Sequence, residues 1–163
     1  MLRRKWNGSP ECFFCEHNES IDHLFFQCSI AKVVWACVAR CFGASDIPGN
    51  LDQCWSWFDQ WLPQGKKFHV LGTTTIFWAI WKARNKACFD NKIIKSPLEI
   101  IYHAGALMKL CAGLYSEMDK QALKEGVNTM LKFAMDIPAS KQSKLSVKDE
   151  DLQDKQDGGQ HEK

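Results

Sequence analysis

Three cysteines and one histidine lie close together near the start of the sequence, at Cys12, Cys15, His23 and Cys28. Two residues separate the first two cysteines, so both thiolates can bind one metal ion from a tight turn. The histidine and the third cysteine can bind the opposite side of the same metal ion. Three thiolates and one imidazole make the tetrahedral shell that zinc adopts in structural sites, with no position left for water. The spacing therefore predicts a structural Zn2+ ion rather than a catalytic one.

The ligand set has alternatives that the sequence leaves open. His17 can replace His23 as the fourth ligand, and Cys37 and Cys41, one turn apart on a predicted helix, can supply a second thiolate pair. We favour the set with His23 because its two loops are short and cost the least conformational entropy to close. Cys37 and Cys41 are then expected to be buried apolar residues on a helix face.

The eight cysteines of this 163-residue chain do not indicate a disulfide framework. The chain starts Met-Leu-Arg-Arg-Lys, without an apolar signal segment, and it is long enough to bury a core without covalent links. A redox Cys-x-x-Cys motif needs a strand before it and a helix after it, whereas turn-forming residues flank this pair. We therefore expect reduced thiols and an intracellular protein, either nuclear or cytoplasmic.

Two ordered motifs carry a family resemblance. The first runs from Leu-Arg-Arg-Lys-Trp at 2–6 through the ligands to Val-Trp at 34–35, and the second is Phe-Trp-Ala-Ile-Trp-Lys-Ala-Arg-Asn-Lys at 77–86. Together they resemble the zinc-binding domain found downstream of the polymerase in plant LINE-type (non-LTR) retrotransposon reverse transcriptases. The second motif is similar to the Trp-x2-Trp-x2-Arg-Asn stretch of those proteins. The resemblance covers about the first ninety residues.

The resemblance implies a module that contacts template RNA or target DNA. The family's polymerase needs a carboxylate pair that holds two metal ions, and no Asp-Asp occurs in this sequence. We therefore expect a fragment of such an element, or a gene derived from one, without enzymatic activity and without a small-molecule substrate. The alternatives are a zinc-stabilised domain that binds another protein and a retroelement remnant without function.

Charge indicates which part of the chain is suited to nucleic acid. The net charge of the whole chain is only +2. In the zinc-binding segment, acidic residues oppose Arg3 and Arg4, and three thiolates around one zinc add a further negative unit. The denser basic stretch contains Lys82, Arg84 and Lys86. We expect these three residues, helped by Arg3 and Arg4, to contact phosphates.

Aromatic rings are expected to pack rather than to bind a ligand. A knuckle of about thirty residues has almost no core of its own and needs its rings to cover the metal. Trp6 and Phe13 are the rings that we expect to be most exposed, and stacking of nucleic-acid bases on them is the alternative to packing. Trp78 and Trp81 are three residues apart, so they share one side of a helix, and we expect both to pack. His103 lies in an apolar stretch and is expected to be an ordinary packing or surface histidine.

Apolar periodicity predicts an all-α fold with an N-terminal zinc knuckle packed on a small helical domain. Helices are predicted at about 30–42, 51–62, 75–89, 96–118 and 120–135. Gly43 and Pro63 are placed to end the first two helices. The β-branched run at 73–75 favours a strand locally, but no partner strand is visible.

The chain is expected to have three parts. Residues 1–45 form the zinc-binding knuckle and first helix, residues 46–137 the helical region, and residues 138–163 a disordered polar tail. The tail contains no aromatic residue and carries both charges in nearly equal number. No membrane association is expected, because no apolar run approaches the length of a span.

Overall fold

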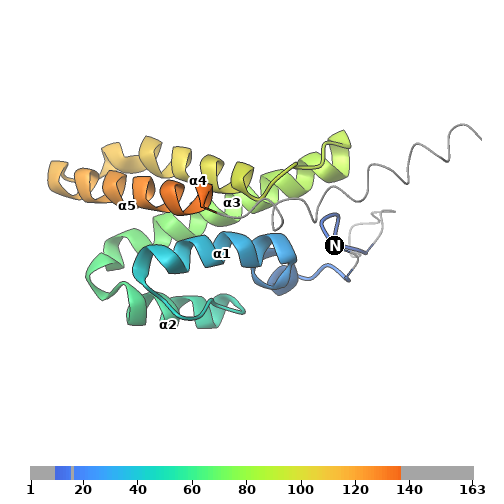
Figure 1. Ribbon diagram of the computed structural model, residues 1–163, viewed down its shortest axis with the longest axis horizontal. Coiled ribbons are helices and arrows are strands. Elements are labelled where there is room, and N and C mark those ends of the chain that lie inside the picture. The colour runs from blue at the N-terminus through green and yellow to red at the C-terminus, as the bar shows by residue number, and fades with distance from the viewer. Residues whose placement is uncertain (1–9, 16, 137–163) are drawn as a thin grey trace, which may run out of the picture.

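The computed structural model describes residues 10–15 and 17–136, which form an all-α fold with the Cys/His cluster near its N-terminal end (Figure 1). These residues contain one isolated β-bridge, between Glu11 and Asn18, and no strand. The elements are a π-helical turn η2 (His23–Gln27), α1 (Ser29–Phe42), α2 (Leu51–Trp61), a 3-10 turn η3 (Pro63–Gly65), α3 (Lys66–Asp90), α4 (Leu98–Cys111), a 3-10 turn η4 (Ala112–Leu114) and α5 (Glu117–Met135). The predicted all-α class is confirmed for this part of the chain.

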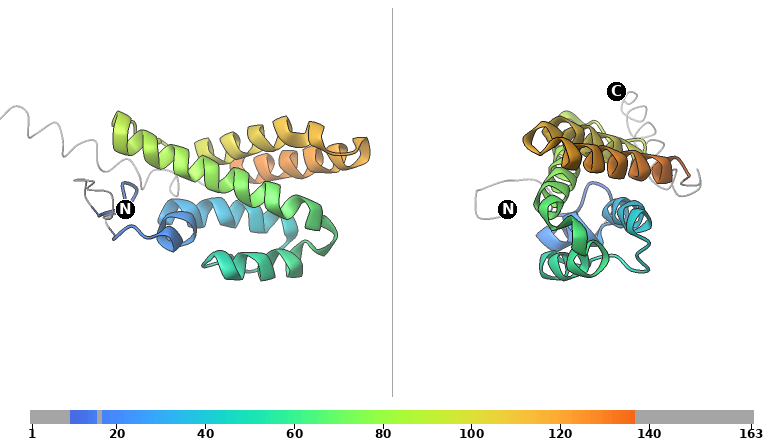
Figure 2. Two further views of the ribbon diagram at one scale, coloured as in Figure 1. Left: turned by 180° about the vertical axis from the view of Figure 1, so that it is seen from behind. Right: turned by 90° about the vertical axis from the view of Figure 1, so that its left-hand side faces the viewer.

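Helix α3, with 25 residues, runs between two pairs of helices. Figure 2 shows α4 and α5 side by side on one side of α3, and α1 with α2 on the other. Helix α5 also contacts α1, so the two pairs of helices touch each other directly as well as through α3. The buried apolar residues form one cluster that extends from Cys12 to Ala134. The zinc-binding segment and the helices therefore share a hydrophobic core.

Trp35 on α1 connects the N-terminal segment to the helices. Its ring stacks on Phe26 of η2 at a centroid distance of 5.6 Å and meets Phe77 of α3 edge-on at 6.4 Å. Trp57 of α2 lies 6.1 Å away, also edge-on. The indole N–H of Trp35 donates to the carbonyl of Phe25 at 2.8 Å, so the buried polar atom is paired. This aromatic centre fixes η2 between α1 and α3.

The ends of the first two helices follow their predicted signals. Helix α1 ends at Gly43, whose φ of 69° is in the left-handed region that glycine adopts without strain. Helix α2 starts at Asn50, whose side chain accepts a hydrogen bond from the amide of Gln53 at 2.9 Å. It ends just before Pro63.

Helix α3 begins at Lys66, nine residues before the predicted start at 75. The β-branched run belongs to this helix and not to a strand. The hydroxyl of Thr74 donates to the carbonyl of Val70 at 2.7 Å, and that of Thr75 donates to the carbonyl of Leu71 at 2.8 Å. Thr74 and Thr75 are tolerated here because their hydroxyls bond to the preceding turn of the helix.

The helix predicted at 96–118 is shorter than expected, since α4 ends at Cys111. The chain then turns through η4, and the Ser116 hydroxyl accepts a hydrogen bond from the amide of Asp119 at 3.3 Å to start α5. Near the middle of α4, a Cβ placed on Gly105 would lie 3.1 Å from Val127 Cγ1. Glycine at that position lets α4 and α5 approach closely.

The tail predicted at 138–163 lies outside the described residues. Among the residues that are described, no helix is both long enough and apolar enough to span a membrane.

Candidate metal centre

A short hairpin presents the first two cysteines. The amide of Cys12 donates to the carbonyl of His17, and the amide of His17 donates to the carbonyl of Cys15, both at 2.8 Å. The amide of Glu19 closes the base of the hairpin by donating to the carbonyl of Pro10 at 2.8 Å. Because these bonds turn the chain within the Cys-x-x-Cys segment, both thiols reach the same cluster.

The other two donor residues lie at the ends of η2: His23 is its first residue, and Cys28 comes directly after it. The hydroxyl of Ser20 accepts a hydrogen bond from the amide of His23 at 3.0 Å, at the start of the turn. The amide of Cys28 donates to the carbonyl of His23 at 2.7 Å, five residues back, which is the bond pattern of a π-helix. This wide turn places Cys28 directly before α1. The histidine and the third thiol are thereby held on one short, hydrogen-bonded unit.

The donor atoms of Cys12, Cys15, His23 and Cys28 all lie within 4.8 Å of one another. Cys28 Sγ is 3.8 Å from Cys12 Sγ and 3.7 Å from Cys15 Sγ, and Cys15 Sγ is 3.2 Å from His23 Nε2. Two sulfurs bound to one tetrahedral zinc at ~2.3 Å stand about 3.8 Å apart. A disulfide needs about 2.05 Å. The donor atoms therefore fit a zinc ion in both type and separation.

The buried thiols of Cys12 and Cys28 influence each other's titration. The hydrogen bond with Cys28 lowers the pKa of Cys12. The same pairing, together with burial, raises the pKa of Cys28. The pair therefore loses one proton readily and the second only with difficulty. A divalent cation between the sulfurs would supply the positive charge that a second thiolate needs.

The alternative ligands lie elsewhere. His17 is exposed, and its ring stacks 5.9 Å from that of His23 without joining the thiols. Cys37 and Cys41 lie on α1, where the Cys41 thiol donates to the carbonyl of Cys37 at 3.1 Å. Burial raises the pKa of Cys37 to about 11 and that of Cys41 to about 12. Both therefore remain neutral thiols on the face of α1. Of the two histidines considered, His23 is the one that lies in the cluster.

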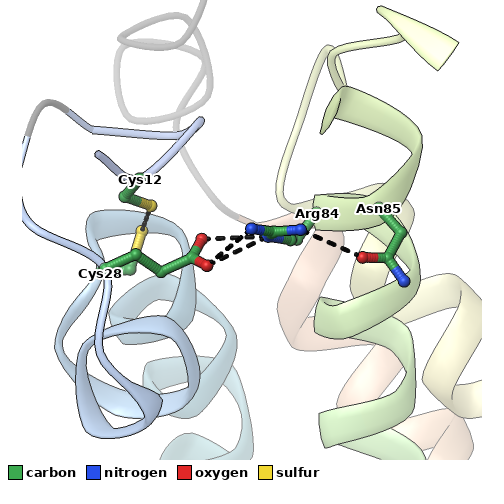
Figure 3. Close-up of polar contacts among 5 residues, drawn as sticks. Cys12, Cys28, Arg84 and Asn85 are labelled. Atoms are coloured by element: carbon green, nitrogen blue, oxygen red, sulfur yellow. Dashed lines mark hydrogen bonds and ion pairs between the residues drawn. The ribbon is translucent and has the colours of Figure 1, made fainter. Parts of the chain in front are cut away.

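A buried ion pair joins the zinc-binding segment to α3. Arg84 Nη2 lies 2.9 Å from Glu19 Oε1, and Arg84 Nε donates to both carboxylate oxygens at 3.2 and 3.1 Å. The side chains are only 2% and 12% exposed. Figure 3 shows the guanidinium of Arg84 directed from α3 toward the segment that carries Cys12 and Cys28. The guanidinium also lies 5.8 Å from the ring centroid of Phe13. The two sequence motifs are thus in direct contact.

The residues predicted to contact phosphate have different surroundings. Lys82 is half-buried and Lys86 is exposed, both on α3. Arg84 has a role other than the one expected, because its ion-paired side chain lies in the interior and not at the surface where a phosphate would bind. Arg3 and Arg4 lie outside the described residues. Among the described members of the predicted set, only the two lysines are accessible to phosphate.

Three aromatic residues also differ from expectation. Trp78 and Trp81 are 50% and 39% exposed, although both were expected to pack against the core. Helical spacing showed that they share a side of α3 but not that this side faces solvent. Phe13 is half-buried beneath Arg84 rather than among the most exposed rings. Trp6 lies outside the described residues.

Residues 1–35 match the family model described as zinc-binding in reverse transcriptase. This match includes all four donor residues and ends within α1. It spans 35 of the 163 residues, so it concerns the zinc-binding segment and not the helices that follow. Searches of curated proteins and of solved structures found no match. The chain therefore carries a reverse-transcriptase-type zinc-binding segment with a Cys3His cluster.

Proposed function

We propose that this chain is a structural zinc-binding module derived from a plant LINE-type retrotransposon reverse transcriptase. In this proposal the module acts inside the cell, where it contacts nucleic acid. It has no catalytic activity of its own. The observation that carries the proposal is the cluster of three thiols and one imidazole, within 4.8 Å, inside the matched segment. When bound, zinc would hold the hairpin to η2 and the start of α1. A complete set of four protein donors leaves no position for a reacting water, which favours a structural role.

Metal content measured on the purified protein tests the zinc part of this proposal. We expect one zinc ion per chain by native mass spectrometry, and its loss in Cys28→Ala, because a small metal site gains its folding free energy from the metal. Cys37→Ala is the matched control, since Cys37 is a buried cysteine outside the cluster. A wild-type protein that is purified without zinc and takes up no zinc when the ion is added would contradict the proposal.

The nucleic-acid part rests on the accessible lysines of α3. Binding through phosphate contacts weakens as salt rises, because each neutralised phosphate releases counterions. We expect RNA or DNA binding whose affinity falls steeply between low and physiological salt. Binding that is absent at low salt would refute this part and leave the zinc site untouched.

Protein binding is a second candidate, and exposed apolar side chains favour it. Leu110, Leu114 and Met118 are all largely exposed where α4, η4 and α5 meet. An apolar group of this kind favours contact with another protein. Such an interaction would be insensitive to salt, so the same titration distinguishes the two candidates.

A further inference from the structure

One face of α3 is aromatic and open to solvent. The rings of Trp78 and Trp81 lie 5.0 Å apart, and their side chains are 50% and 39% exposed. Phe89 extends the face toward the end of the helix. At 3.6 residues per turn, Trp78, Lys82 and Phe89 fall within an arc of about 40° around α3, and Trp81 lies about 60° from Trp78 on the side away from Lys82. Exposed large rings along one face of a helix indicate a surface that contacts another molecule.

Other tryptophans of the protein show how a packed indole differs from these two. Trp35, Trp57 and Trp61 each donate the indole N–H to an oxygen atom. Trp78 and Trp81 make no such bond to the described residues. Their rings contact each other at a centroid distance of 5.0 Å, and their exposed parts are available for stacking.

A pocket of about 260 Å³ adjoins the aromatic face, between α3 and the start of α4. It is lined by Lys82 and Lys86 from α3, Lys92 from the connection, and Glu99 and His103 from α4. None of the three lysines forms an ion pair with the described residues. The carboxylate of Glu99 accepts a hydrogen bond from a backbone amide at 2.9 Å. The pocket therefore has an excess of unpaired positive charge.

His103 supplies an unpaired polar atom to the same region. Its Nε2 is buried and has no hydrogen-bond partner among the described residues. Burial, and then the charges of Lys82 and Lys86, lower the pKa of His103. A buried nitrogen without a partner costs free energy, and an anion with several acceptor oxygens would satisfy both the nitrogen and the lysines. A phosphate group is such an anion.

We propose that this face of α3 binds single-stranded nucleic acid, with Trp78 and Trp81 stacking on bases and the pocket of Lys82, Lys86 and His103 binding a backbone phosphate. This inference rests on the nucleic-acid role proposed above and narrows it to unpaired strands. Exposed rings can stack on unpaired bases without sequence preference, whereas bases in a duplex already stack on one another. Lys82 lies one helical turn from Trp78 and lines the pocket, so a base and its phosphate would contact neighbouring residues.

The combination of groups favours nucleic acid over a protein partner. Protein interfaces are rich in aromatic residues but depleted of lysine, and here three unpaired lysines line the pocket next to the aromatic face. A strand of nucleic acid supplies a flat apolar surface and a negative charge in every nucleotide. Each nucleotide therefore offers a base that can stack on the tryptophans and a phosphate that can pair with the lysines.

Fluorescence anisotropy of the zinc-loaded full chain with a labelled oligouridylate of about 12 nucleotides tests the stacking role. Trp78→Ala and Trp81→Ala should each weaken binding about 5- to 150-fold, and the corresponding Phe variants should retain most of it. Trp55→Ala is the matched control, because Trp55 on α2 is 40% exposed and lies outside the face. A duplex of equal length should compete poorly.

Histidine NMR tests the phosphate pocket independently. Adding unlabelled oligouridylate should raise the pKa of His103, because a phosphate offsets the lysine charges and accepts a hydrogen bond from the ring. The charged groups that face His103 are Lys82, Lys86 and Lys92, with Glu99 opposing them. In Lys86→Gln the upward change should shrink, and in Lys109→Gln, at the far end of α4, it should persist.

The outcomes separate this inference from the broader proposal. If the wild type binds no RNA or DNA at low salt, both fall. If the wild type binds but Trp78→Ala and Trp81→Ala bind within twofold of it, or a duplex competes equally well, the nucleic-acid role stands and the single-strand face is refuted. An unchanged pKa of His103 in the presence of bound oligonucleotide likewise overturns the phosphate pocket.

Discussion

Replacing Arg84 with methionine tests whether the zinc-binding segment and the helices form one cooperative structure. Arg84 is 2% exposed and is bound through two of its nitrogens to Glu19, which is 12% exposed. Removing the guanidinium leaves the carboxylate of Glu19 buried without its cation. Breaking a buried pair in this way typically costs about 3–5 kcal/mol, far more than the loss of a surface pair.

That cost is large compared with the stability of a domain of this size, which is on the order of 5–15 kcal/mol. It corresponds to a fall in Tm of about 6–20 °C. The double variant Glu19→Gln/Arg84→Met should recover much of the loss, because no unpaired charge is then buried. The matched control is Lys66→Met. Lys66 pairs with Asp59 at 3.2 Å, but both side chains are exposed, so Tm should hardly change.

Thermal unfolding of the zinc-loaded protein, followed by far-UV circular dichroism, measures these differences in Tm, and urea unfolding measures the corresponding free energies. Hydrogen exchange adds the location of the effect, because loss of the ion pair should increase exchange across the hairpin and η2 more than in α5. If Arg84→Met behaves like Lys66→Met, the ion pair contributes no more than a surface pair and the reasoning is wrong. The same conclusion follows if the two single substitutions at Glu19 and Arg84 are additive.

The remaining predictions concern the metal and the basic helix. His23→Ala should abolish stoichiometric zinc binding, whereas His17→Ala should retain it; metal analysis showing the reverse would contradict the ligand assignment. Lys82→Glu with Lys86→Glu should weaken RNA or DNA binding and lower the salt slope by about one unit per lost contact, and Lys109→Glu should do neither. Chelation should leave most of the far-UV helix signal intact, since apolar burial holds the helices together, and complete loss of that signal would show that folding requires the metal.

The sequence predicted the donor set because ligand spacing is a local property. Cys12 and Cys15 share one turn, His23 and Cys28 share another, and short loops leave few other ways to combine them. The ends of α1 and α2 were predictable for the same reason, since Gly43 and Pro63 act on their own turns.

The contact between Glu19 and Arg84 was not predictable in this way, because 65 residues separate the two. The only available signal was that Glu19 lies in the first motif and Arg84 in the second. Charge counting treated Arg84 as one more cation of a basic stretch, whereas burial makes it a partner of a single carboxylate. The exposure of Trp78 was missed for a related reason, since periodicity groups residues by side but does not tell which side meets the core.

The ion pair also reconciles an acidic zinc-binding segment with the proposed contact to nucleic acid. Pairing removes Glu19 from the surface and neutralises its charge, while Arg84 is withdrawn from the same surface. Arg84 and Lys82 are two residues apart, about 160° around the helix. The zinc-binding segment docks on the side of α3 that carries Arg84. Lys82 and Lys86 lie away from that side and line the pocket between α3 and α4. A bound zinc ion would then support the proposed binding indirectly, because it would hold the segment that docks on one side of a helix whose other side is proposed to contact the strand.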